Sequence, residues 1–108
     1  MSDWNISPLD LKTKLDRGEK PVLLDVREPW EYQLAHIDGS LLIPLNEIAA
    51  RKEEIESETE VVILCHHGIR SLAALEYLRR QGFTNLKNLA GGIDAWSMRA
   101  DPRVPRYR

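Results

Sequence analysis

Residues 61–71 read Val61-Val62-Ile63-Leu64-Cys65-His66-His67-Gly68-Ile69-Arg70-Ser71. The first four are apolar without interruption, as are strands in a parallel sheet that is covered on both faces. A helical pattern begins near Ser71 and continues to Gln81. We expect the buried side of this helix to carry Leu72, Leu75 and Leu78. A buried strand, a tight loop and a helix in succession predict the α/β fold class.

The rest of the chain alternates in the same way. Strands are predicted at residues 22–26, 40–43 and 86–89, helices at residues 8–17, 30–35 and 93–98, and a helical period over residues 45–55. Ser7 and Pro8 are typical of a helix start, and Gly18 is typical of a helix end. The alternation predicts a parallel sheet with helices on both faces. Trp30 is expected to be a core or half-buried anchor.

The composition is that of one globular domain. The chain has 108 residues, of which 43% are hydrophobic and 30% charged, and a formal net charge of −2. This balance excludes disordered and collagen-like chains, and it offers no basic surface for nucleic acid. The apolar runs are too short to span a membrane, and the first residues lack a signal-peptide pattern. We therefore expect a cytoplasmic monomer with no membrane partner.

The cysteine and histidine content limits the chemistry. One cysteine cannot form an internal disulfide, and a reducing compartment is the default expectation. One cysteine and three histidines are too few, and wrongly spaced, for a structural zinc site. No metal and no other cofactor is expected.

The loop after the apolar strand is the candidate site. In open α/β sheets, ligands bind beyond the carboxyl ends of the strands, and Cys65 lies at that edge. Gly68 permits a positive φ, and a tight loop entering a helix turns successive N–H groups toward one point. Arg70, His66 and His67 add positive charge. Such surroundings stabilise a thiolate, so the loop predicts nucleophilic cysteine chemistry on a small anion.

A plainer interpretation stands beside this one. A free cysteine is often just a small buried residue at the end of a core strand. Either histidine could simply point to water. A papain-type pair of cysteine and histidine is not favoured, because adjacent loop residues rarely supply the oriented third partner that such a pair needs.

Three segments carry a resemblance to a known family. They are Asp25-Val26-Arg27-Glu28-Pro29-Trp30-Glu31-Tyr32 running into His36-Ile37-Asp38-Gly39-Ser40 and Pro44, the loop Cys65 to Arg70, and Gly91-Gly92-Ile93-Asp94-Ala95-Trp96. In this order they resemble the signatures of rhodanese-like sulfurtransferases. The resemblance implies a rhodanese-like fold with a small parallel sheet of about five strands, over residues 1–98. Residues 99–108 are predicted to be an extended tail, laid on the surface or mobile. That tail is similar to those of rhodanese domains fused to ubiquitin-activating-type adenylyltransferases.

The resemblance also implies a mechanism and a set of site residues. Cys65 would take the outer sulfur of thiosulfate or another sulfane donor, become a persulfide, and pass the sulfur to cyanide or a protein thiol. His66, His67, Gly68, Ile69 and Arg70 would bind the substrate, with Arg70 on the sulfonate of the donor and His66 ranked above His67. Asp25, Arg27 and Ser71 are expected to support the loop. The partners are a small anionic sulfur donor and a protein acceptor.

Three alternatives stay open at this stage. In the family, a loop of six residues from the cysteine goes with sulfur transfer, and related phosphatases and arsenate reductases have one residue more. Residues 65–70 are six, which argues against a phosphatase or arsenate reductase on the same fold. A sulfur relay to a cofactor or tRNA thiolation partner, and a non-catalytic interaction module, are the other two. The presence of Cys65 argues against the module.

Overall fold

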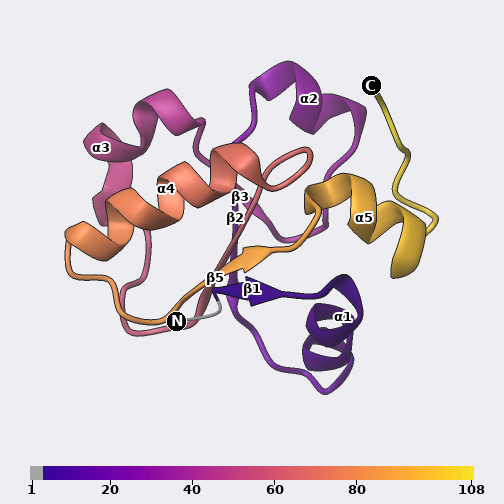
Figure 1. Ribbon diagram of the computed structural model, residues 1–108, viewed down its shortest axis with the longest axis horizontal. Helices are drawn as coiled ribbons and strands as arrows, with labels where there is room; N and C mark the ends of the chain where they lie inside the picture. The colour runs from indigo at the N-terminus through magenta and orange to yellow at the C-terminus, as the bar shows by residue number, and fades with distance from the viewer. Residues whose placement is uncertain (1–3) are drawn as a thin grey trace.

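The computed structural model describes residues 4–108, and a parallel sheet organises them (Figure 1). The sheet has five strands in the order β1-β5-β4-β2-β3, and all neighbouring pairs are parallel. The strands are β1 (Asn5–Ile6), β2 (Val22–Asp25), β3 (Leu41–Leu42), β4 (Val61–Leu64) and β5 (Leu86–Leu89). The predicted α/β class and the five-stranded parallel sheet are confirmed.

Helices cover both faces of the sheet. They are α1 (Pro8–Asp16), α2 (Pro29–Leu34), α3 (Ile48–Arg51), α4 (Ile69–Arg80) and α5 (Gly92–Arg99), with short 3-10 turns η1 (Leu45–Glu47) and η2 (Lys52–Glu54) on either side of α3. Apolar side chains of α3 and α4 pack in one core, and those of α1 and α5 pack in a second core across the sheet. No helix within residues 4–108 is long and apolar enough to cross a bilayer.

The central strand β4 contributes to both cores. Val61, Ile63 and Cys65 belong to the core on the α4 side, and Val62 and Leu64 belong to the core on the α5 side. Successive side chains of a strand point to opposite faces, so an apolar run is required where both faces are covered. This burial explains why the sequence signal over residues 61–64 is continuous rather than alternating.

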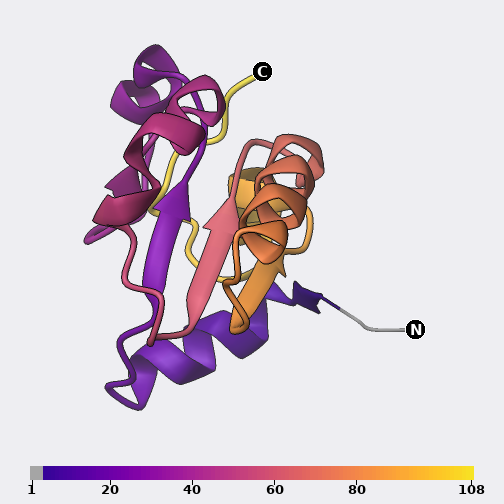
Figure 2. The same cartoon turned by 90° about the vertical axis from the view of Figure 1, so that its left-hand side faces the viewer.

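The carboxyl ends of the strands meet at one edge of the molecule. In Figure 2 the central strands β2 and β4 run upward, and the C-terminal segment rises to the same end, where α2 also lies. The loop after β4 therefore meets α2 and the end of the chain, segments that are far apart in sequence. This is the edge at which the candidate site was expected.

The structure corrects three local expectations and adds one strand that was not predicted. Leu72 is 45% exposed, because the buried face of α4 is formed by Ser71, Ala74, Leu75 and Leu78. Trp30 is 58% exposed rather than an anchor in the core. The helical period over residues 45–55 is broken into η1, α3 and η2. The sequence pattern missed β1, because a strand of two residues is too short to show a period.

Candidate active site

Backbone N–H groups at the start of α4 surround the sulfur of Cys65. The Sγ atom accepts the N–H of Gly68 at 3.0 Å and the N–H of Ser71 at 3.4 Å, and Ser71 Oγ lies 3.3 Å from it. The residue is 1% exposed. A helix N-terminus carries about half a positive charge, so these donors stabilise negative charge on the sulfur.

Gly68 and Asn88 hold the loop in this shape. Gly68 is the N-cap of α4 and has a φ of +105°, which favours glycine because it has no Cβ. Asn88 on β5 is buried, accepts a hydrogen bond from the Ser71 hydroxyl and donates to the carbonyl of Gly68. Asn88 was not among the residues expected from the sequence, although an asparagine inside a predicted strand of a covered sheet was the available signal.

The start of α5 fixes the other side of the loop. The N–H of Ile93 donates to the carbonyl of Cys65 at 2.8 Å, and the N–H of Asp94 donates to the carbonyl of His66 at 3.1 Å. Gly92 has a φ of +66°, and a Cβ on it would lie 2.4 Å from the His66 carbonyl oxygen and 2.5 Å from that of Cys65. The sequence identified Gly92 only as a turn residue. It is the contact point between α5 and the loop.

Arg70 points to a carboxylate. Its two terminal nitrogens donate to the two oxygens of Glu31, at 2.7 and 2.8 Å. Glu31 is in the third position of α2, where its side chain also accepts the N–H of Glu28 in a capping box. The hydrogen bonds from Arg70 lower the pKa of Glu31 to about 2, despite its burial. The pair in turn raises the pKa of Arg70.

A buried ion pair lies beside this one. Arg27 and Asp25 are both fully buried, and Arg27 Nη2 is 2.6 Å from Asp25 Oδ2. Arg27 also donates to the carbonyls of Glu31 and Ala35. The two residues therefore join the end of β2 to α2, and α2 carries Glu31.

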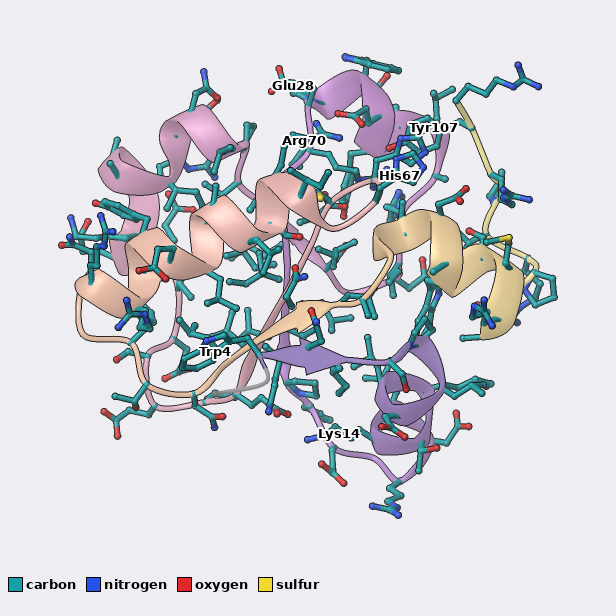
Figure 3. All side chains as sticks on the ribbon, in the orientation of Figure 1. Trp4, Lys14, Glu28, His67, Arg70 and Tyr107 are labelled. Atoms are coloured by element: carbon teal, nitrogen blue, oxygen red, sulfur yellow. The ribbon has the colours of Figure 1, made fainter. Side chains whose placement is uncertain are left out.

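The C-terminal segment joins the Asp25–Arg27 and Glu31–Arg70 pairs into one cluster. The hydroxyl of Tyr107 accepts from Arg27 at 2.9 Å and donates to Glu31 at 2.8 Å, and burial raises the pKa of Tyr107 to about 12. Its ring stacks on His66, and its carbonyl accepts from His66 Nε2. Figure 3 shows Tyr107, His67 and Arg70 together at one end of the molecule and Lys14 at the opposite end. Nothing in the sequence pattern pointed to Tyr107.

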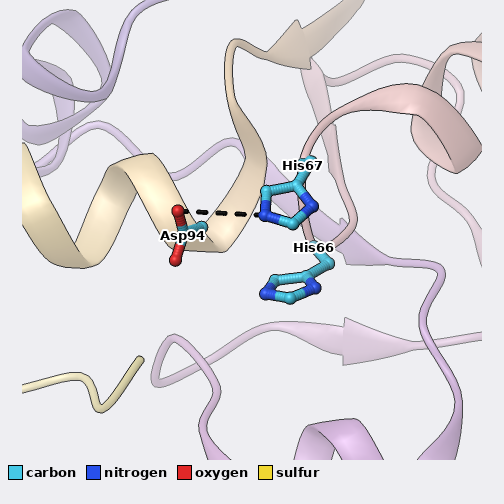
Figure 4. A group of neighbouring side chains, drawn as sticks. All are labelled: His66, His67 and Asp94. Carbon is cyan, nitrogen blue, oxygen red and sulfur yellow. Dashed lines mark ion pairs between the residues drawn. The ribbon is translucent and has the colours of Figure 1, made fainter. Parts of the chain in front are cut away.

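His66 and His67 differ in surroundings. The His66 ring lies between Tyr107 and His67, and burial followed by the proximity of His67 lowers the pKa of His66. The His67 side chain is 61% exposed, and its Nε2 lies 3.9 Å from Asp94 (Figure 4). Ile69 is 79% exposed. Among the predicted substrate-binding residues, Gly68 donates its N–H to the Cys65 sulfur, and Arg70 pairs with Glu31. His66 contacts Tyr107 of the C-terminal segment.

His66, His67 and Asp94 are close enough to be considered as metal ligands. Their ligand atoms lie within 4.8 Å of one another. The two rings, however, stack with centroids 3.9 Å apart, and a metal ion must lie in the plane of each imidazole that binds it. Asp94 is also paired with Arg106 at 2.9 Å. As placed, the group is a ring stack with ion pairs rather than a coordination sphere.

Glu31→Gln is expected to lower stability in a pH-dependent way. The pKa of Glu31 falls from 4.5 to about 2 on folding, so ionised Glu31 stabilises the fold above pH 4.5. This contribution is about 3 kcal/mol at neutral pH, and it is lost as the pH falls toward 2. Urea denaturation of both proteins between pH 7 and pH 3 measures it. A difference that does not change with pH would contradict the assignment.

Tyr107→Phe is expected to lower stability by about 1.5–3 kcal/mol. The change removes a hydroxyl that bonds two charged groups, Arg27 and Glu31, and hydrogen bonds to charged groups have this magnitude. Arg103→Gln is the control, because it removes an exposed ion pair of the same segment, and such exposed pairs contribute little to stability. Thermal denaturation of both variants checks this. Equal effects would mean that the Tyr107 contacts add no stability.

The fold and the loop together define a small α/β domain in which a thiol directly follows a central parallel strand and faces the N-terminus of the next helix. Residues 7–99 match the rhodanese-like domain family. The chain belongs to this family, so the resemblance seen in the sequence is confirmed.

Individual relatives agree with this assignment. The chain is 36% identical over 104 residues to the Mycobacterium tuberculosis protein named "Probable adenylyltransferase/sulfurtransferase MoeZ", covering 94% of this chain and 26% of that protein. It is 34% identical over 122 residues to "Adenylyltransferase and sulfurtransferase MOCS3" of Arabidopsis thaliana, covering 98% of this chain and 26% of that protein. The chain thus spans about a quarter of the length of these relatives.

A solved structure matches over nearly the whole fold. The crystal structure of a rhodanese-related protein from Thermoplasma volcanium superposes with a TM-score of 0.83 at 32% identity, covering 95% of this chain and 98% of that one. The chain is therefore a rhodanese-like domain whose relatives include proteins named as sulfurtransferases.

Proposed function

We propose that this protein is a sulfurtransferase that carries a sulfane sulfur as a persulfide on Cys65. The supporting observation is the position of the Cys65 sulfur, which directly follows β4 and accepts hydrogen bonds from the N–H groups of Gly68 and Ser71 at the start of α4. Donors preorganised around a site of negative charge stabilise both the attacking thiolate and the persulfide anion.

The reaction has two steps. The Cys65 thiolate attacks the outer sulfur of thiosulfate or of a persulfide, the S–S bond of the donor breaks, and sulfite or a thiolate leaves with the electron pair. A nucleophile, cyanide in an assay or a protein thiolate in a cell, then attacks the outer sulfur of the Cys65 persulfide and releases the thiolate of Cys65. Ping-pong kinetics follow from this order.

The partners and the setting are part of the same proposal. The substrates are a small sulfur donor and a protein sulfur acceptor, and relatives whose names include sulfurtransferase support this choice. A monomer is part of the same proposal. The cytoplasm suits the reaction, because a reducing compartment keeps the Cys65 thiol free.

The test is the intact mass of the reduced protein after thiosulfate or cysteine persulfide, and again after cyanide. We expect a gain of one sulfur atom that cyanide removes. No gain with either donor would overturn the proposal. Arsenate reduction and hydrolysis of aryl phosphates would then be measured, since both are chemistries that the sequence left open on this fold.

A further inference from the structure

We propose that Glu31 selects the class of sulfur donor. Because Glu31 holds Arg70 in an ion pair, the site favours organic persulfides over thiosulfate. This inference rests on the proposed sulfur transfer at Cys65 and adds a specificity-determining residue to it. It gives Arg70 a different role from the one expected from the sequence, which was to bind the sulfonate of the donor.

Several hydrogen bonds hold the Glu31–Arg70 ion pair in place. Both terminal nitrogens of Arg70 are bonded to Glu31, which is 3% exposed. The remaining acceptor positions of the carboxylate take the N–H of Glu28 and the hydroxyl of Tyr107. A carboxylate with four hydrogen bonds stays ionised and fixed in place. A sulfonate that approached Arg70 would have to compete with this bidentate pair.

The other arginines near the loop are also paired with carboxylates. Arg27 is paired with Asp25, and Arg106 is paired with Asp94. His66 is held toward its neutral form by burial, which lowers its pKa. Arg70, Arg27 and Arg106 are thus each paired with a carboxylate, and Asp94 also lies 3.9 Å from His67. No arginine among these three offers an uncompensated charge to a dianion.

The two donor classes differ in the charge that they bring. Thiosulfate carries a sulfonate with two negative charges over the whole ion, and sulfite leaves as a charged group. An organic persulfide brings no sulfonate, and its leaving thiolate carries one charge. The step balances as Cys65–S⁻ plus R–S–SH giving Cys65–S–SH plus R–S⁻. The sulfane sulfur moves, one S–S bond breaks, one forms, and no external oxidant or reductant is required.

The test measures the second-order rate of persulfide formation on Cys65 with thiosulfate and with cysteine persulfide. The native protein is expected to react faster with cysteine persulfide. Glu31→Gln frees Arg70 and should raise the thiosulfate rate about ten- to hundred-fold, the range that one charged hydrogen-bonded contact supplies. The cysteine persulfide rate should stay within about threefold. An unchanged thiosulfate rate in folded Glu31→Gln would overturn the inference.

Two further variants act as controls. Glu31→Gln combined with Arg70→Gln removes both charges and should return the thiosulfate rate to the native value. Glu60→Gln changes the net charge by the same amount as Glu31→Gln, but Glu60 pairs with Lys14, which lies at the opposite end of the molecule (Figure 3). Glu60→Gln should leave both rates unchanged. A rise in the thiosulfate rate with Glu60→Gln would mean that overall charge, not Glu31, sets the preference.

A measurement on the native protein covers the case in which Glu31→Gln does not fold. Attraction between an uncompensated Arg70 and thiosulfate would weaken with added salt. We expect the thiosulfate rate to be constant or to rise between low and high ionic strength. A steep fall would overturn the inference. Failure of the proposed function has a separate signature, because Cys65 would then take up sulfur from neither donor.

Discussion

Cys65→Ser is expected to abolish sulfur uptake completely. Oxygen at this position cannot form a persulfide, and the chain has no second cysteine that could take the sulfur. The fold should remain, because a serine hydroxyl can accept the same N–H groups of Gly68 and Ser71. We expect the free energy of unfolding to change by about 1 kcal/mol.

Intact mass and urea denaturation check the two halves of this prediction together. The native protein should gain one sulfur atom and lose it to cyanide, and Cys65→Ser should show no gain under the same conditions. Turnover retained by the serine variant would end the persulfide mechanism. Loss of both folding and sulfur uptake would show that the thiol supports the core rather than the reaction.

Gly92→Ala is expected to destabilise the protein by more than about 3 kcal/mol and to remove activity. The new Cβ would lie within 2.5 Å of the carbonyl oxygens of both Cys65 and His66, and neither is the end of a flexible side chain. The positive φ of Gly92 adds about 1–2 kcal/mol of strain for any other L-residue. To relieve the clash, α5 must move away from the loop, which breaks the hydrogen bonds from Ile93 and Asp94.

Gly39→Ala is the matched control for this change. Gly39 has a φ of +83°, but a Cβ on it would meet nothing within 4 Å. It should therefore cost only the strain of about 1–2 kcal/mol and leave sulfur uptake intact. Thermal denaturation and the mass assay of both variants separate the two effects. Equal losses at Gly39 and Gly92 would show that the backbone conformation matters and the contact with the loop does not.

Local patterns predicted most of the fold. The apolar run Val61–Leu64 and the Ser7 and Pro8 start of α1 are where the sequence placed them, whereas α4 begins at Ile69, two residues before the predicted start at Ser71. Leu72 shows the limit of such patterns. Leucines at residues 72, 75 and 78 share a helical period, but the face of α4 that packs on the sheet is decided by where β4 and β5 lie.

The residues of the candidate site also fall into two groups, those that a local pattern predicts and those that only the fold brings together. Cys65, Gly68 and Ser71 lie within seven residues, so a strand ending in a tight turn brings their atoms together wherever the fold places the segment. Glu31 was visible only as part of a family signature. Its function as the partner of Arg70 depends on a contact 39 residues away.

The sequence by itself determined the fold class, the family and the cysteine loop, because each depends on residues that are close in the chain. Only the tertiary structure decided that Arg70 is held by Glu31 and that Tyr107 bonds Glu31 from 76 residues away. The physical reason is topological. Such pairs form because a parallel sheet brings the ends of β2 and β4 and the last residues of the chain to one edge, and no local pattern of hydrophobicity encodes which of them meet.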